Sequence, residues 1–223
     1  MKRSLLLVFT LAGSLLVTAQ KPQWDSAYRP STYIVKTELF RAFPNSTNDI
    51  IFLGNSITDY TEWNELLGLS TARNRGISGD ITFGVLQRLD EVTEGKPAKV
   101  FILIGINDIS RNVPDTVIVA NYKKIISRIK KESPQTKIYF NTLLPVNNTF
   151  PNRDNFTNKF QNILNVNEEI RKLAKTEGIT VIDIHPHFLD AENKLDKKYT
   201  YDGLHLDGDG YQKWASLLKP YLN

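Results

Sequence analysis

The sequence predicts an α/β protein in which a mainly parallel, five-stranded sheet lies between two layers of helices. Two observations support this prediction. Short, unbroken apolar runs alternate with segments whose apolar residues recur at helical spacing. Such alternation implies right-handed crossovers, and therefore neighbouring strands that are parallel and covered on both faces. The expected fold is a three-layer α/β/α sandwich of the flavodoxin-like type.

The apolar runs give the expected strands. Ile50–Leu53 is a run of strand formers with no polar interruption, and Gly54 after it allows a sharp turn. Four further strands are expected at Ala72–Arg75, Lys99–Ile104, Lys137–Leu144 and Ile179–Ile184. The Lys99–Ile104 run is the most apolar of the five.

The segments between the strands have helical patterns. Ile81–Glu94 has apolar residues on one face, and a longer helix with Pro114 near its start has a row of isoleucines on its inward face. Further helices are expected from about Phe156 to Lys175 and from Tyr211 to Tyr221. Asp209 is the expected N-cap of the last helix.

The first residues have the pattern of a secretory signal peptide. Residues 1–19 combine a basic start, an apolar run and small residues that end at Ala19. The apolar run is shorter than the ~20 residues that a membrane-spanning helix needs. We therefore expect cleavage after Ala19, a secreted or periplasmic protein, and no stable membrane anchor after cleavage.

The rest of the chain is expected to form one domain with a short preceding segment. Residues 20–48 form a polar lead-in whose aromatic side chains pack on the domain, with a short helix over Val35–Phe43. Residues 49–223 form the domain itself. Without the signal peptide, 204 residues remain, which is enough to bury a sizeable core.

Composition excludes several classes of function. After loss of the signal peptide, 26 basic residues face 24 acidic ones with no basic block, so nucleic acid is not an implied partner. Cysteine is absent, which excludes disulfides and cysteine-based sites. Asp207–Gly210 is similar to the start of a calcium loop but lacks the later ligands, so no metal or cofactor is expected. The oligomeric state is left open.

Residues that could take part in catalysis come just after the ends of the expected strands. Ser56 comes just after the first strand, Gly79 after the second and Asn107 after the third. The carboxyl ends of parallel strands meet at one edge of the sheet, which is where such folds bind ligands. Ser56 at the start of a helix is therefore a candidate nucleophile, with a helix cap as the alternative. Gly79 and Asn107 could equally be turn residues.

A serine nucleophile needs a base, and the base needs a partner that holds its tautomer. His205 follows Asp202 by three residues, a spacing that brings the two side chains to one side of a helical turn. The other two histidines, His185 and His187, follow the fifth strand and fit a loop or pocket-lining role. The candidate catalytic residues are therefore Ser56, His205 and Asp202.

Four separated segments resemble, in order, the motif blocks of the SGNH hydrolases, also called GDSL esterases and lipases. They are Gly54–Ile57 (GNSI), Gly76–Asp80 (GISGD), Gly105–Asp108 (GIND) and Asp202–His205 (DGLH). The resemblance implies the fold of that family and hydrolysis of carboxylic esters through an acyl-enzyme. It also implies that no cofactor takes part.

The resemblance also assigns roles. Ser56 would attack the ester, His205 would move its proton, and Asp202 would orient His205. The backbone N–H groups of Ser56 and Gly79 and the side-chain amide of Asn107 would hold the oxyanion. This sequence has Asn55 and an isoleucine where the family name has Asp and Leu. The Gly-Asn-Ser form is similar to that of relatives that act on acetylated sugars and of acetylhydrolase-like members, which implies an acetylhydrolase/acetylesterase-like branch of the family.

The substrate follows less directly from the sequence. The polar loop Val146–Asn155, with Phe150, is expected beside the site, and Tyr60 and Trp63 could stack on a sugar ring or pack in the core. Asn55 is a further candidate contact. Because no broad apolar stretch suggests a lipase, we expect a small-molecule or glycan ester, with a short acyl group such as acetyl on a polar alcohol. A lysophospholipase, an acyl-thioesterase and a non-catalytic carbohydrate-binding relative remain alternatives. Glycosylation sequons occur at Asn45, Asn147 and Asn155.

Overall fold

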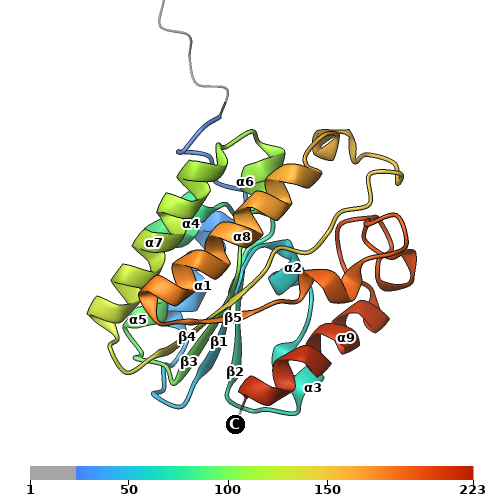
Figure 1. Cartoon of the computed structure of the whole chain (residues 1–223). Helices are drawn as coiled ribbons and strands as arrows, with labels where there is room; N and C mark the ends of the chain where they lie inside the picture. The colour runs from blue at the N-terminus through green and yellow to red at the C-terminus, as the bar shows by residue number, and fades with distance from the viewer. Residues whose placement is uncertain (1–23, 223) are drawn as a thin grey trace, which may run out of the picture.

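The structure is a computed structural model that describes residues 24–222 (Figure 1). The expected signal peptide lies outside the described residues. Five strands form one sheet in the order β2-β1-β3-β4-β5, and each neighbouring pair is parallel. They are β1 (Ile50–Gly54), β2 (Ala72–Gly76), β3 (Lys99–Leu103), β4 (Lys137–Asn141) and β5 (Thr180–Ile182). The predicted parallel, five-stranded sheet is confirmed.

Helices cover both faces of this sheet. They are α1 (Tyr33–Ala42), α2 (Ser56–Asp59), α3 (Trp63–Leu67), α4 (Thr82–Gln87), α5 (Asp90–Thr93), α6 (Ile106–Ser110), α7 (Asp115–Glu132), α8 (Phe160–Glu177) and α9 (Gly208–Leu218). α4 packs on α7 and α7 on α8 over one face, whereas α3 packs on α9 over the other (Figure 1). This is the predicted three-layer arrangement.

A ladder of aromatic rings fixes the centre of the sheet. Phe52 of β1, Phe101 of β3 and Tyr139 of β4 are in register and stack with ring centroids 5.2 and 4.6 Å apart. Trp63 of α3 stacks on Phe52 at 3.9 Å and meets Trp214 of α9 edge-on at 4.9 Å. Large aromatic rings bury much apolar area, so this ladder joins the sheet to the α3–α9 layer.

Three helix predictions are corrected by the structure. The segment Ile81–Glu94 is two short helices, α4 and α5, which are separated at Arg88 and Leu89. α8 begins at Phe160, because residues 154–156 form a separate 3-10 turn. The N-cap of α9 is Asp207, whose extended backbone lets its carboxylate accept the N–H of Gly210 at 2.9 Å. The expected cap, Asp209, already lies within the helix.

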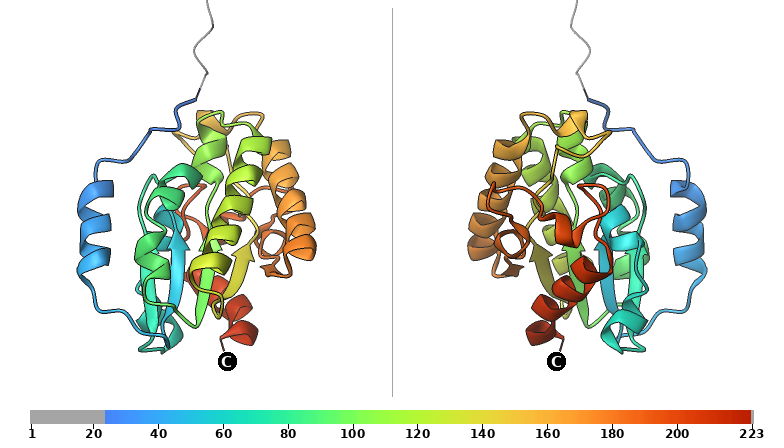
Figure 2. Two further views of the ribbon diagram at one scale, coloured as in Figure 1. Left: turned by 90° about the vertical axis from the view of Figure 1, so that its left-hand side faces the viewer. Right: turned by 90° about the vertical axis from the view of Figure 1, so that its right-hand side faces the viewer.

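The described part of the lead-in runs along the outside of the molecule to α1, which lies at its outer edge (Figure 2). Trp24 stacks on Phe83 of α4 at 5.7 Å, and the Tyr33 hydroxyl donates to the carbonyl of Gly84 at 2.8 Å. The lead-in is thus fastened to the domain at Trp24 and at Tyr33, the first residue of α1. Within residues 24–222, no helix has the length and apolar character needed to cross a bilayer.

Candidate active site

The turn after β1 places Ser56 at the start of α2. A side chain at Gly54 would lie 2.2 Å from the Thr58 hydroxyl and 2.4 Å from the Leu103 carbonyl, so only glycine fits at this turn. Asn55 then caps α2 by accepting the N–H of Ile57 at 3.0 Å. The tight turn and the cap fix the direction in which the Ser56 side chain leaves the sheet edge.

The structure brings together Ser56, His205 and Asp202, which the sequence singles out. The Ser56 hydroxyl lies 2.9 Å from Nε2 of His205, and Nδ1 of His205 lies 2.7 Å from Oδ2 of Asp202. With its proton on Nδ1, the imidazole donates to the carboxylate and presents Nε2 as an acceptor for the serine hydroxyl. The three side chains therefore form one continuous chain of hydrogen bonds.

The environment of Asp202 favours its charged form. Partial burial acts to raise the pKa of this carboxyl, but hydrogen bonds from the His205 side chain and from backbone N–H groups outweigh burial and hold the pKa below its usual value. Oδ1 accepts the N–H groups of His205 at 2.8 Å and Leu204 at 3.0 Å. A carboxylate fixed in this way keeps the histidine in one orientation.

Arg153 is a site residue that sequence reasoning missed. Its guanidinium forms an ion pair with Oδ2 of Asp202, the same oxygen that binds His205. Arg153 belongs to the loop that was expected beside the site, and Phe150 of that loop packs so closely on Gly203 that a side chain there would lie 2.9 Å from its ring. An arginine in a polar loop carries no sequence signal of such a contact.

The same loop is anchored through Asn147. Its backbone N–H donates to the Gly203 carbonyl at 2.8 Å, and its side-chain amide donates to the Leu195 carbonyl at 2.9 Å. Asn147 is 1% exposed, so the sequon at this position is closed to glycosylation in the folded chain.

Gly79 and Asn107 lie at the same edge as Ser56. Gly79 has a positive φ of 81°, a conformation that favours glycine. The Asn107 side-chain amide donates to the Asp80 carbonyl at 2.9 Å, which joins α6 to the turn after β2. An amide has two N–H donors, so one remains for a ligand.

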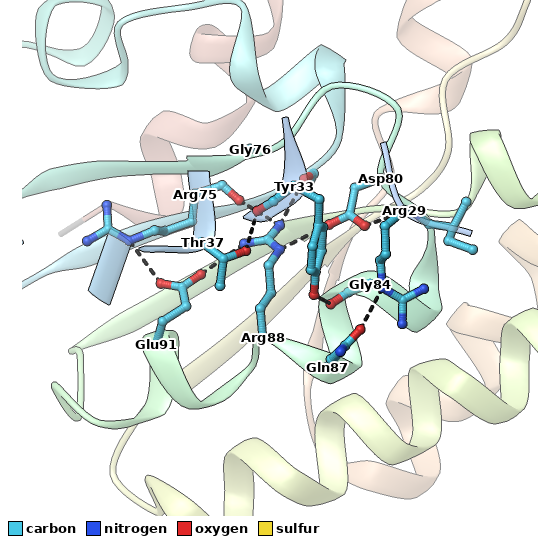
Figure 3. A network of polar contacts seen from close by, with 12 residues as sticks. Arg29, Tyr33, Thr37, Arg75, Gly76, Asp80, Gly84, Gln87, Arg88 and Glu91 are labelled. Carbon is cyan, nitrogen blue, oxygen red and sulfur yellow. Dashed lines mark hydrogen bonds and ion pairs between the residues drawn. The ribbon is translucent and has the colours of Figure 1, made fainter. Parts of the chain in front are cut away.

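A buried ionic network holds these turns together (Figure 3). Arg88 is fully buried and pairs with Asp80 at 3.0 Å. Its Nη2 donates to the carbonyls of Gly54 and Arg75, which lie at the ends of β1 and β2, at 3.2 and 2.9 Å. One side chain thus connects both strand ends to the residue that follows Gly79. In the sequence, Arg88 looks like a surface residue of a helix, so this role was not expected.

Asp108, next to Asn107, is buried and accepts two hydrogen bonds from the Thr82 N–H, at 3.0 and 3.1 Å. Burial raises the pKa of Asp108 to about 7, against the opposing effect of the bonds from Thr82. Because the pKa in the folded chain lies above its usual value of 3.8, the stability that the protonated form provides is lost as the pH rises through about 7.

For Asp108→Asn, we expect a flatter dependence of stability on pH. Between pH 5 and pH 8 the wild type should lose about 2 to 3 kcal/mol of unfolding free energy through this carboxyl, and the variant should not. Urea unfolding of both proteins at the two pH values measures the difference. If the free energy of unfolding fell by the same amount between pH 5 and pH 8 in both proteins, the pH dependence would not come from Asp108.

The four candidate substrate contacts have different positions. Tyr60 is 51% exposed and its ring centroid lies 5.0 Å from that of His205, so it is open to a ligand. Phe150 is partly buried against Gly203. Trp63 and Asn55 are 1% and 0% exposed. The expectation that they contact substrate is corrected: Trp63 is a core residue and Asn55 is a helix cap.

His185 has the structural role expected for it. It is buried, and its Nδ1 lies 2.7 Å from the Leu143 carbonyl. His187 is exposed in the same turn. Residues 24–222 contain no group of three or more histidine, aspartate or glutamate side chains that could hold a metal ion.

Comparisons with known proteins match most of this chain. The family model described as GDSL-like lipase/acylhydrolase matches residues 52–213. The chain is 30% identical over 172 residues to the platelet-activating factor acetylhydrolase IB subunit alpha2 of Rattus norvegicus, covering 74% of this chain and 72% of that protein.

Two solved structures are similar over most of their length. One, from Streptococcus pneumoniae, is described as the structure of a platelet activating factor. It is 32% identical to this chain with a TM-score of 0.77, and the match covers 86% of this chain and 92% of that chain. A GDSL-like lipase from Bacteroides thetaiotaomicron is 25% identical with a TM-score of 0.76, covering 85% and 96%.

Proposed function

The chain belongs to the GDSL-like lipase/acylhydrolase family and is a carboxylic ester hydrolase; from this premise we propose that Ser56, His205 and Asp202 are its catalytic triad. The observation that carries the proposal is the continuous chain of hydrogen bonds from the Ser56 hydroxyl through His205 to Asp202, with distances of 2.9 and 2.7 Å. A nucleophile, a base and a group that orients the base are the three parts that such catalysis requires.

The proposed reaction has two halves. Ser56 Oγ attacks the ester carbonyl while Nε2 of His205 takes its proton, and Asp202 stabilises the imidazolium that forms. The tetrahedral intermediate collapses, His205 returns the proton to the leaving alcohol, and an acyl-enzyme remains. Water then attacks the acyl group, with His205 again accepting and returning the proton, which releases the acid and restores Ser56.

The negative charge of the tetrahedral intermediate needs donors that are already in place. We assign these to the backbone N–H groups of Ser56 and Gly79 and to the second N–H of the Asn107 amide. Each such donor typically contributes ~3–4 kcal/mol to lowering the barrier. The hydrogen bond from Asn107 to the Asp80 carbonyl, at 2.9 Å, fixes the amide against rotation and so supports this role.

We propose a short acyl group, most specifically acetyl, on a carbohydrate or a similarly polar alcohol. The acetylhydrolase name of the 30% identical relative supports an acetyl group. Tyr60, exposed beside His205, offers an aromatic face on which a sugar ring could stack. Export by cleavage after Ala19 is part of the same proposal, since it would bring the enzyme to extracellular or periplasmic esters.

The test is hydrolysis of p-nitrophenyl esters of increasing acyl length by the purified protein, alongside Ser56→Ala and His205→Ala. We expect acetate to be cleaved fastest, with kcat/KM falling steeply by octanoate, and both variants to be inactive. Faster cleavage of long chains would favour the lysophospholipase or acyl-thioesterase alternative. Equal activity in the two variants and the wild type would refute the triad.

A further inference from the structure

The lead-in covers the edge of the site where Gly79 lies. A side chain built at Gly79 would come within 3.2 Å of the Pro30 ring and 3.4 Å of the Tyr28 hydroxyl. These two residues therefore form a wall directly beside the proposed oxyanion hole. The Arg29 side chain between them is bound to Gln87 at 2.6 Å, which holds the wall against α4.

Arg111 stacks on the Tyr28 side chain of this wall. Its guanidinium carbon is 3.3 Å from the centre of the Tyr28 ring, a distance at which the cation lies directly on the aromatic face. The backbone N–H of Arg111 donates to the carbonyl of Asn107 at 3.1 Å, so the two residues are one helical turn apart on the same side of α6. Arg111 therefore borders the oxyanion hole through both Tyr28 and Asn107.

The guanidinium of Arg111 is free to bind a ligand. Arg111 is exposed, and its side chain forms no hydrogen bond or ion pair with any residue in the part of the chain that the structure describes. The other arginines at this edge are engaged: Arg153 pairs with Asp202 and Arg29 is bound to Gln87. Stacking on Tyr28 restricts the guanidinium plane but leaves its N–H groups available.

The residues next to Arg111 in the chain are themselves engaged. The next residue, Asn112, accepts a hydrogen bond at 2.6 Å from the ammonium group of Lys159. The nearest carboxylate along the chain, Asp108, faces inward and is bonded to Thr82. A ligand bound to the Arg111 guanidinium would therefore meet no exposed carboxylate from α6.

We propose that Arg111, held on Tyr28, binds a carboxylate or phosphate group on the alcohol part of the ester substrate. The planar fork of a guanidinium matches both of these anions in a bidentate geometry. The inference rests on the proposed function, because an acetyl group has no further charge and the anion must then belong to the alcohol. The substrate class is an acetyl ester of an acidic polyol or of a phosphorylated alcohol.

The first experiment compares two aryl acetates that differ in charge, 4-acetoxybenzoate and its methyl ester. For Arg111→Gln, the ratio of kcat/KM for the anionic ester to that for the neutral ester should fall roughly 10- to 100-fold, the loss expected for hydrogen bonds to a charged group. Arg111→Lys should restore part of the ratio. Arg171→Gln, which removes a partly exposed surface arginine from α8, is the matched control and should leave the ratio as in the wild type.

The second experiment does not depend on hydrolysis. Binding of sodium glucuronate, glycerol phosphate and glucose to the Ser56→Ala protein is measured by ligand-observed NMR, with and without Arg111→Gln. The proposal expects at least one anion to bind more tightly than glucose, and Arg111→Gln to abolish the difference. The preferred anion separates a uronate-type carboxylate from a phosphate.

The outcomes separate the two proposals. If wild type hydrolyses neither ester but binds an anion through Arg111, the proposed esterase activity on simple esters fails and the anion site stands. If both esters are hydrolysed with the same ratio in wild type and Arg111→Gln, and no anion binds better than glucose, the anion site is refuted while the esterase stands.

Discussion

Replacement of Ser56 by alanine should lower kcat/KM for p-nitrophenyl acetate by about 10⁴- to 10⁶-fold. The hydroxyl is the group that forms the acyl-enzyme, and its oxygen lies 2.9 Å from the base that activates it. Without it, the oxyanion donors and the histidine remain, so only a small residual rate above the uncatalysed reaction is expected. Initial rates of p-nitrophenol release across a range of substrate concentrations measure the loss.

Ser78→Ala is the matched control for this experiment. Ser78 lies at the same sheet edge, but its hydroxyl donates to a carboxylate oxygen of Asp59 at 3.1 Å instead of facing the histidine. We expect this variant to stay within several-fold of wild type. A loss in Ser78→Ala as large as that in Ser56→Ala, with both proteins folded, would show that the nucleophile has been assigned wrongly.

Replacement of Arg88 by methionine should lower the free energy of unfolding by about 3 to 5 kcal/mol. Arg88 is buried and pairs with two buried carboxylates, Asp80 at 3.0 Å and Glu91 at 2.9 Å. Removal of the cation would leave both carboxylates buried, although Glu91 would keep its pair with Arg75 (Figure 3). Urea unfolding at pH 8, followed by tryptophan fluorescence, measures the change.

The loss in Arg88→Met should depend on pH in a defined direction. Burial already raises the pKa of Asp80 and Glu91 above their usual values, although Arg88 opposes this. Without Arg88 the two pKa values should rise further, so the carboxyls can be neutralised as the pH falls and the destabilisation should be smaller at pH 5 than at pH 8.

Arg171→Met provides the comparison for Arg88→Met. Arg171 forms an ion pair with Asp183 at 3.0 Å on the exposed side of α8, and such surface pairs contribute about 0 to 1 kcal/mol. We expect a loss within that range at both pH values. If Arg88→Met were no less stable than Arg171→Met, the buried network would not support the sheet edge as inferred.

The sequence alone determined which segments form the strands and that neighbouring strands run parallel. A short, unbroken apolar run such as Ile50–Leu53, followed by a glycine turn, is typical of a strand covered on both faces, and helical spacing between such runs implies parallel pairing. The same logic places Ser56, Gly79 and Asn107 at one edge. These inferences depend on residues close in sequence, whose geometry the chain itself limits.

Other features depend on contacts between distant residues, so only the tertiary structure decided them. Trp63 lies near Ser56 in sequence, yet the face of α3 that carries it packs on the sheet, where its ring stacks on Phe52. Arg153 meets Asp202 because the loop that carries Arg153 is bonded, through the backbone N–H of Asn147, to the carbonyl of Gly203, the residue after Asp202.

The lead-in shows most clearly which features follow from the sequence and which depend on the tertiary structure. Its aromatic residues indicated packing on the domain, but nothing in the sequence indicated that Tyr28 would lie between Gly79 and Arg111. Local residue patterns determine which segments become strands and helices, because each kind of element buries apolar residues at its own spacing along the sequence. The partner of an individual side chain is set by the packing of all the layers together, which joins residues dozens of positions apart.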